Sequence, residues 1–489
     1  MRTKNKKYQL KTYSKKLLAD TLTPVSVYLR LRDKFPNSLL LESSDYHAND
    51  NSFSYICFNP IASIKVENET IFQHFPDGKS TVTDLKSPPS KGDLGGCSQS
   101  VPNTLDEFAA TFSIEYINPS PAAAGYRGGH NGLFGFMAFD AVRYFEDISL
   151  SKKEENLEMP DLYYAVYQNI IAINHFNNEA YIFAHCFEAE NNIPQIEQIL
   201  KSKSFAEYPF ERNGERTTNL NDEDFKALVR KCKEHCQRGD VFQIVPSKRF
   251  SQKFTGDEFN VYRALRSVNP SPYLFYFDYG NFKIFGSSPE AQLVVKGNTA
   301  EIHPIAGTFK RTGNDEQDAE LAKKLSEDKK ENSEHVMLVD LARNDLSRHG
   351  TNVKVETYRE VQFFSHVIHL VSKVTATKNP TVSTMQIAAD TFPAGTLSGA
   401  PKHKALQLLE KYENRSREFY GGAIGFMDFS GNFNHAIIIR SFVSKNHTLH
   451  YQAGAGVVSE SDEENELQEV YNKLGALTKA LELAETIAP

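Results

Sequence analysis

The chain has 489 residues, of which 40% are hydrophobic, enough for roughly two to four folding units or one large interwoven unit. Its 55 basic and 62 acidic residues give a formal charge of -7, which argues against nucleic-acid binding. No stretch approaches the roughly 20 apolar residues of a membrane-spanning helix, and no apolar export signal follows the basic start. Five cysteines do not make a disulfide framework in a chain this long. We expect a cytoplasmic enzyme.

Short β-rich runs dominate the first part of the chain, and the second part mixes similar runs with helices. Two polar segments resemble connectors, Pro76–Asn103 and Lys201–Asn219. They divide the chain into an N-terminal region, 1–205, and a C-terminal region, 220–489, with 206–219 as the connector between them. Because strands and helices do not alternate regularly, we predict an α+β fold. The expected strands are Ser54–Phe58, Ile61–Glu67, Tyr163–Asn174, Ala180–Cys186, Phe275–Phe277, Gln292–Val295 and Ile437–Phe442.

Three helices are predicted in the C-terminal region. The first begins at a cap formed by Asn221 or Asp222 and ends near Gly239. The second covers roughly 327–345 and the third about 462–485.

The second and third helices carry acidic residues at helical spacing. Glu331 and Glu334 share one helix face, as do Glu466, Glu469 and Lys473. Mg²⁺ uses only one or two protein carboxylates and completes its octahedron with water and substrate oxygens. These faces could therefore supply an open magnesium site, although acidic helix faces are more often simply solvated.

Two glycine-containing turns lie in the same region. The turn at Gly454 and Gly456 directly precedes the third helix, where backbone N–H groups can approach an anion. The segment Phe392–Pro401 is dense in Gly, Pro and hydroxyl residues and is unlike an ordinary connector.

Two further patterns allow more than one interpretation. Cys232, His235 and Cys236 suggest zinc, but both cysteines lie on the apolar stripe of their helix and fit better as core residues. His366 and His369 occupy a strand-like stretch, where a histidine is a packing residue or a proton carrier.

The order of the motifs resembles that of the chorismate-utilising enzymes, and within them the large subunits of anthranilate synthase. The resemblance extends from Leu39 to Lys473. It rests on the segments Gly239–Phe250, Asn269–Phe275, Ser288–Glu290, His303–Thr308, Glu334–Asp345, His366–Ser372, Phe392–Lys402, Tyr420–Gly425 and Gly454–Gly456.

This resemblance implies a four-layer α/β/β/α sandwich of two mainly antiparallel sheets with helices outside. It implies that chorismate and ammonia give anthranilate and pyruvate, the first step toward tryptophan, with Mg²⁺ as cofactor. Glu334 and Glu469 match the metal ligands, supported by Glu331 and Glu466.

The resemblance also assigns roles in catalysis and substrate binding. Glu290 matches the general acid that protonates the leaving C4 hydroxyl, which requires a carboxyl protonated at working pH. His369 matches the histidine used in pyruvate elimination, and Thr396 lies in the loop that closes the site. The positions matching substrate contacts are Gly307, Thr308, Tyr420, Arg440, Gly454, Ala455, Gly456 and Lys473.

Two positions distinguish this chain from sister enzymes. Isochorismate and salicylate synthases have a lysine where this chain has Gln243, and glutamine cannot serve as the base that activates water. Aminodeoxychorismate synthases typically have a nucleophilic lysine where this chain has Ala306. Both differences favour direct attack of ammonia at C2.

The resemblance also implies where the ammonia comes from and how the enzyme is regulated. No Gly-x-Cys-x-Gly elbow occurs, so the resemblance implies a separate glutamine amidotransferase subunit. Ser43 and the segment Pro272, Tyr273 and Leu274 match a tryptophan inhibitor pocket, whereas Ser52–Cys57 lacks the Arg and Gly often found there.

Two alternative functions remain. One is a catalytically silent subunit that binds tryptophan, and the other is an enzyme that stops at 2-amino-2-deoxyisochorismate.

Overall fold

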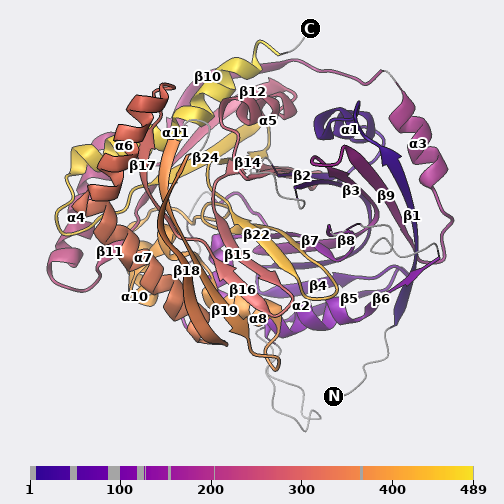
Figure 1. Ribbon diagram of the computed structural model, residues 1–489, viewed down its shortest axis with the longest axis horizontal. Coiled ribbons are helices and arrows are strands. Elements are labelled where there is room, and N and C mark those ends of the chain that lie inside the picture. The colour runs from indigo at the N-terminus through magenta and orange to yellow at the C-terminus, as the bar shows by residue number, and fades with distance from the viewer. Residues whose placement is uncertain are drawn as a thin grey trace.

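The computed structural model describes residues 7–43, 52–85, 100–117, 126, 128–151, 153, 156–202, 204–363 and 367–487. It confirms the α+β class, with helices on the outside of the strands (Figure 1). The paired strands form two mainly antiparallel sheets that share two long strands, β3 and β8.

The first sheet contains one parallel pair, β6 with β1, and is otherwise antiparallel. Its order is β6 (Phe112–Tyr116), β1 (Tyr8–Leu18), β9 (Glu179–Cys186), β8 (Leu162–Asn174), β3 (Phe53–Glu67), β2 (Leu39–Glu42), β13 (Tyr273–Asp278), β14 (Phe282–Ser288), β23 (Ser441–Lys445), β24 (Thr448–Gly454), β12 (Ser247–Gly256) and β10 (Phe210–Thr218).

The second sheet is antiparallel throughout. Its order is β5 (Ser80–Asp84), β4 (Thr70–His74), β3, β8, β7 (Leu133–Met137), β21 (Ala423–Met427), β22 (Phe433–Ile437), β15 (Ala291–Lys296), β16 (Thr299–Ile302) and β19 (Val367–Lys378), which also pairs with β17 (Ile305–Lys310) and β18 (Gly350–Phe363). A separate short pair joins β11 (Gln243–Ile244) and β20 (Gly399–Ala400).

The structure has four layers, and one hydrophobic cluster lies between each layer and the next. Phe134 and Ile437 of the second sheet and Phe275 and Val443 of the first lie in one cluster, which is therefore the core between the sheets. The outer face of the first sheet packs on α1 (Pro24–Leu31), α3 (Ile193–Lys201), α4 (Asp222–Gln237), α5 (Phe259–Val268), α10 (Lys402–Tyr412) and α11 (Glu463–Ala484). The outer face of the second packs on α2 (Val101–Ala110), α7 (Lys329–Ser347) and α8 (Thr384–Thr391). This confirms the α/β/β/α sandwich.

Two further helices lie close to the second sheet. Leu325 of α6 (Asp315–Glu327) packs on Ile368 and Leu370 of β19. The short helix α9 (Gly395–Ser398) lies in the Phe392–Pro401 segment, where Gly395 allows close approach to Leu341 of α7. A Cβ at Gly395 would stand 1.8 Å from a methyl carbon of Leu341, so α9 depends on glycine at that position.

The predicted helices are confirmed. Asn221 caps α4, whose Cys232 and Cys236 are buried in the core, in agreement with the core interpretation of those cysteines. Asp328 caps α7 and Asp462 caps α11. Among the described residues, no helix is long and apolar enough to cross a membrane.

Two expectations about local structure were wrong, one for the segment 206–219 and one for the segment 437–442. Most of the connector expected at 206–219 is strand β10, because its polar side chains lie on an exposed edge strand paired with β12. The N- and C-terminal regions also share both sheets, through β2 with β13 and β7 with β21. The single strand expected over Ile437–Phe442 is interrupted between β22 and β23, and this interruption holds Arg440.

Candidate active site

Glu290 lies between β14 and β15, where the main chain is held on both sides. Its carbonyl oxygen accepts a hydrogen bond from the Ile437 N–H at 3.0 Å. The side chain is 9% exposed, and burial raises the pKa of the carboxyl to about 8. Thr396 opposes this shift by donating its hydroxyl to Glu290 Oε1 at 3.2 Å, and Arg440 and Lys473 oppose it through their charges. Near neutral pH this carboxyl therefore holds a proton that it can donate.

Arg440 faces the same carboxyl from the break between β22 and β23. Its backbone is in the left-handed region, with φ of 50°, which is uncommon for a non-glycine residue. The Ser287 N–H donates to the Arg440 carbonyl at 3.2 Å and holds this conformation against β14. Burial lowers the pKa of the guanidinium and the charge of Glu290 opposes that shift, so the two side chains act on each other electrostatically.

His369 lies on β19 directly opposite Thr308 of β17. Between Ala306 and Thr308 the register shifts at Gly307, whose φ is 65°, and the Gly307 carbonyl accepts a hydrogen bond from His369 Nδ1 at 2.7 Å. A carbonyl oxygen only accepts, so Nδ1 carries the proton and Nε2 carries the lone pair. Burial lowers the pKa of His369 to about 4, which leaves the ring neutral near pH 7.

Gln243, Glu334 and Gly456 form a tight contact between β11, α7 and the segment before α11. Gln243 Nε2 donates to Glu334 Oε1 at 2.9 Å. A Cβ at Gly456 would stand 2.6 Å from Gln243 Nε2 and 3.5 Å from Glu334 Oε1, so the amide occupies the space that a side chain would need. Glycine at position 456 is therefore required for this contact.

Lys473 connects the last helix to the glycine turn. Its Nζ donates to the Gly454 carbonyl at 2.8 Å and pairs with Glu469 at 2.7 Å. Desolvation lowers the pKa of the ammonium, but the charges of Glu469, Tyr420 and Glu334 outweigh this effect and raise it. The Tyr420 hydroxyl also lies against Gly454, 3.1 Å from the position of an added Cβ.

The two carboxylates assigned to magnesium and the two assigned to support them are divided between α7 and α11. The charges of Glu334 and Glu469 both raise the pKa of the Lys473 ammonium, so carboxylates from the two helices lie near this one group. Glu331 lies near Gly307, with one oxygen 3.3 Å from a Cβ built there, and Glu466 is buried. Within the described ranges, no group of three or more acidic, histidine or cysteine side chains is arranged to hold a metal. Two carboxylates near one another on different helices nevertheless suit Mg²⁺, which uses only one or two protein carboxylates and takes its other oxygen ligands from elsewhere.

A buried ion-pair network beneath the site was not anticipated. The Arg417 guanidinium pairs with Glu413 at 2.7 Å and also donates to the carbonyls of Leu397 and Val245. Leu397 follows Thr396, Val245 lies two residues after Gln243, and the Arg417 guanidinium stands 5.7 Å from the Tyr420 ring centre. One buried cation thus holds three segments that carry site residues. The i, i+4 spacing of Glu413 and Arg417 is the only sign of this pair in the sequence.

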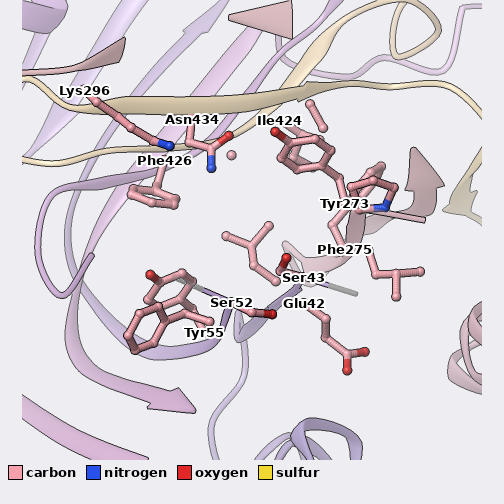
Figure 2. Close-up of a pocket in the computed structure, with 16 residues that line it drawn as sticks. Glu42, Ser43, Ser52, Tyr55, Tyr273, Phe275, Lys296, Ile424, Phe426 and Asn434 are labelled. Atoms are coloured by element: carbon pink, nitrogen blue, oxygen red, sulfur yellow. The ribbon is translucent and has the colours of Figure 1, made fainter. Parts of the chain in front are cut away.

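The second predicted site is a cavity of about 390 Å³ between the two sheets (Figure 2). It brings together Ser43 and the segment Pro272, Tyr273 and Leu274, which lie far apart in the sequence. The remaining lining residues are Leu41, Glu42, Ser52, Phe53, Tyr55, Phe275, Lys296, Ile424, Gly425, Phe426, Asn434 and Ala436.

Aromatic and polar side chains both border this cavity. Figure 2 shows the rings of Tyr55 and Phe426 and the amine of Lys296 toward one side, with Tyr273 toward the other. Lys296, Asn434 and the β21 residues were missed because no local motif marks the far wall of a cavity built from distant strands. Of the histidines considered above, His366 lies outside the described residues.

Comparison with known proteins matches the family described as chorismate binding enzyme over residues 37–479. Anthranilate synthase component 1 of Aquifex aeolicus is 34% identical, covering 96% of this chain and 94% of that protein. The protein of the same name from Thermus thermophilus is 35% identical, covering 98% and 99%. The crystal structure of anthranilate synthase component I from Streptococcus pneumoniae superposes with a TM-score of 0.73 and 30% identity, covering 94% of this chain and 98% of that one.

Proposed function

The chain belongs to the chorismate-binding enzyme family, and on that premise we propose that it converts chorismate and ammonia to anthranilate and pyruvate. This reaction is the first step of tryptophan biosynthesis. The observation that carries the proposal is Glu290, a buried carboxyl whose pKa is raised to about 8, next to the cations of Arg440 and Lys473. A protonated acid beside cationic groups suits a dianionic substrate that must lose a hydroxyl.

Substrate binding uses the cations and the glycine turn. The planar fork of Arg440 can pair with a carboxylate through two parallel hydrogen bonds, and we assign it the enolpyruvyl carboxylate. Tyr420 and the segment Gly454–Gly456 border the same space. Gly307 and Thr308 match further substrate contacts and lie on β17, where Thr308 pairs with His369 of β19.

In the first chemical step, the nitrogen of ammonia attacks C2 of the ring. The C2–N bond forms, the two ring double bonds shift, and the C4–O bond breaks. Glu290 gives its proton to the departing hydroxyl, which leaves as water, and the new C2 ammonium releases a proton to restore the balance. Thr396 holds the carboxyl in place and stabilises the carboxylate that results.

Glu334 and Glu469 would hold Mg²⁺, with Glu331 and Glu466 behind them. When bound, the ion supplies positive charge for the ring carboxylate of the substrate and draws electron density from the ring as the hydroxyl leaves. The contact from Gln243 Nε2 fixes the orientation of the Glu334 carboxylate, as partners of metal ligands commonly do.

In the second step, the aminated intermediate loses pyruvate. A base removes the proton from C2, the C3–O bond breaks, the ring becomes aromatic, and the enolpyruvate takes up a proton as pyruvate. We assign this base function to His369, because Gly307 fixes its tautomer and its low pKa keeps Nε2 unprotonated.

The choice among related reactions follows from two side chains. Gln243 is an amide and cannot take a proton from water, which disfavours isochorismate as product. Ala306 is a buried alanine on β17 and offers no amine for a covalent route. Both positions favour ammonia as the attacking group, and His369 favours anthranilate over release of the aminated intermediate.

We assign the ammonia supply to a separate glutamine amidotransferase subunit, and feedback inhibition to tryptophan bound in the second cavity. The cavity supports this assignment by its size, its aromatic walls and its polar groups, which suit a zwitterionic ligand with an apolar ring.

The proposal is tested by product analysis. The purified protein is incubated with chorismate, Mg²⁺ and ammonium, and the products are separated by chromatography. Anthranilate with equimolar pyruvate supports the proposal, whereas isochorismate, aminodeoxychorismate or unchanged chorismate would contradict it. A silent tryptophan-binding subunit would bind tryptophan and leave chorismate unchanged.

A further inference from the structure

The second cavity carries a positive charge that no described carboxylate offsets. Lys296, the last residue of β15, lines the cavity and makes no ion pair with a described residue. Glu42 is the acidic residue among the described lining, but its carboxylate already accepts hydrogen bonds from the Tyr262 hydroxyl at 2.5 Å and from Arg266 Nε at 3.1 Å. Figure 2 shows that carboxylate pointing away from Lys296. The Lys296 ammonium is therefore the charge that remains for a ligand.

A neighbouring amide on the same wall also lacks a partner. Asn434 Oδ1 is buried and accepts no hydrogen bond from a described donor. Asn434 pairs with Val294 across β22 and β15, and Lys296 lies two residues beyond Val294, on the same face of the strand. Figure 2 shows the Lys296 amine and the Asn434 amide at the same end of the cavity. Because buried polar atoms normally have partners, this pair of groups indicates a polar ligand at that end.

Aromatic rings border this polar end. Phe426 of β21 lies directly opposite Asn434 in the β21–β22 pair, and its ring centre is 5.5 Å from that of Tyr55 in an edge-to-face arrangement. The Tyr55 hydroxyl already accepts a hydrogen bond from the Gly129 N–H at 2.9 Å, so Tyr55 contributes mainly its ring to the wall. A polar group held beside Lys296 and Asn434 is thus attached to a part of the ligand that is apolar.

The two groups together select one kind of polar head. An α-amino acid carries a carboxylate and an ammonium on the same carbon, so both must be bound within one small region. The Lys296 ammonium can donate to the carboxylate, and the amide oxygen of Asn434 can accept from the ammonium. An amine without a carboxylate would be repelled by Lys296, and a carboxylate without an amine would leave Oδ1 without a partner.

We propose that Lys296 and Asn434 bind the head group of the amino acid that occupies the second cavity, with the carboxylate on Lys296 and the ammonium on Asn434 Oδ1. This inference rests on the proposed assignment of that cavity to tryptophan. The segment Ser52–Cys57, which also borders the cavity, contains no basic residue. The cation that recognises the inhibitor is therefore supplied by β15, at a position that also distinguishes tryptophan from the corresponding amine.

The first test replaces Lys296 by Met, which keeps most of the side-chain length and removes the charge. Calorimetric titration measures the binding of L-tryptophan and of tryptamine, which has the same ring and ammonium but no carboxylate. We expect the Kd for tryptophan to rise about ten- to hundredfold, as for loss of a hydrogen bond between charged groups. The Kd for tryptamine should stay the same or fall, because the cation that repels its ammonium is gone.

The second test addresses the other half of the head group. In Asn434→Leu we expect the Kd for tryptophan to rise about tenfold, whereas the Kd for indole-3-propionate, which lacks the ammonium, should stay within about threefold of wild type. Lys11→Met is the matched control, since Lys11 is an exposed lysine of strand β1 that does not line the cavity. Its Kd for tryptophan should stay within about threefold of wild type. Thermal unfolding verifies that the variants fold, and Lys296→Gln replaces Lys296→Met if the latter does not.

Two outcomes would overturn the inference. One is a folded Lys296→Met protein that binds tryptophan as tightly as wild type. The other is a Lys296→Met protein that loses tryptophan and tryptamine affinity equally, which would show that Lys296 maintains the shape of the cavity and does not bind the carboxylate. A wild-type protein that binds no tryptophan would instead contradict the proposed assignment of the cavity, so the two failures are distinguishable.

Discussion

The hydroxyl of Thr396 donates a hydrogen bond to a carboxyl oxygen of Glu290 across 3.2 Å. Thr396 lies on a four-residue helix packed on α7, and Glu290 lies between two strands of different sheets. The bond stabilises the ionised carboxyl, whereas burial stabilises the protonated one. Their balance sets the pH at which Glu290 can act as an acid.

Thr396→Val should move the pH dependence of the reaction upward. At constant free ammonia, the wild-type rate should fall as pH rises through about 8, because Glu290 then loses the proton it must donate. Removing the hydroxyl removes a group that lowers the pKa, so the falling limb should shift to higher pH by up to about one unit. Rate profiles at fixed free ammonia measure the shift. A limb that moves to lower pH, or does not move, would contradict the assigned contact.

Glu290→Gln should lose activity and gain stability. Without the acid, anthranilate formation should fall by a factor of about 10² to 10⁴. In the folded wild type the pKa of Glu290 is raised, so between pH about 5 and about 8 the folded state keeps a proton that the unfolded state has released. Stability of the wild type therefore falls as pH rises through this window, by up to about 1.4 kcal/mol per pH unit from this group.

The neutral glutamine has no such dependence, so the variant should be more stable than wild type at pH 8 by at most a few kcal/mol. Near pH 4, where Glu290 is protonated in both states, the difference should largely vanish. Urea unfolding at the two pH values measures it. If Glu290→Gln exceeds the wild-type free energy of unfolding by the same amount at pH 4 and pH 8, the carboxyl is not buried as described.

His369→Phe should separate the two chemical steps. The variant retains the size of the ring but loses the lone pair of Nε2, so pyruvate elimination should slow by about 10² to 10⁴ while amination continues. The aminated intermediate should accumulate and be detected by chromatography. His235→Phe is the control, since His235 is a buried histidine of α4 that is bonded to Asp240 and Tyr412. If His369→Phe makes anthranilate without intermediate, another group is the base.

Ser43→Phe should relieve tryptophan inhibition. Ser43 lines the second cavity, and a phenyl group there would occupy the volume that we assign to the inhibitor. We expect the tryptophan concentration for half-inhibition to rise at least tenfold, with the rate in the absence of tryptophan within about threefold of wild type. Ser80→Phe, at an exposed position of β5, makes the same exchange away from the cavity. Unchanged inhibition in Ser43→Phe would place the inhibitor elsewhere.

Much of this architecture could be predicted from local signals. Capping residues and apolar periodicity located α4, α7 and α11. Glu290, Thr396 and Arg440 were assigned by resemblance to the family, and they meet in one site. These signals are local because a helix depends on residues three and four apart.

The remaining features depend on contacts between distant segments. Arg440 interrupts a run that reads as one strand, because Ser287 of a different strand holds its carbonyl. Arg417 binds carbonyls of two distant segments, and neither carbonyl has a sequence signature. The far wall of the second cavity, with Lys296 and Asn434, likewise exists only once the sheets are assembled. Strand β10 was missed because an edge strand can carry polar side chains throughout.

The most direct test of the account is anthranilate fluorescence from purified protein with chorismate, Mg²⁺ and ammonium at pH about 8. The account predicts fluorescence that rises with time, requires Mg²⁺, and disappears in Glu290→Gln. Chorismate that stays unchanged in the wild type, or that yields isochorismate in its place, would contradict it.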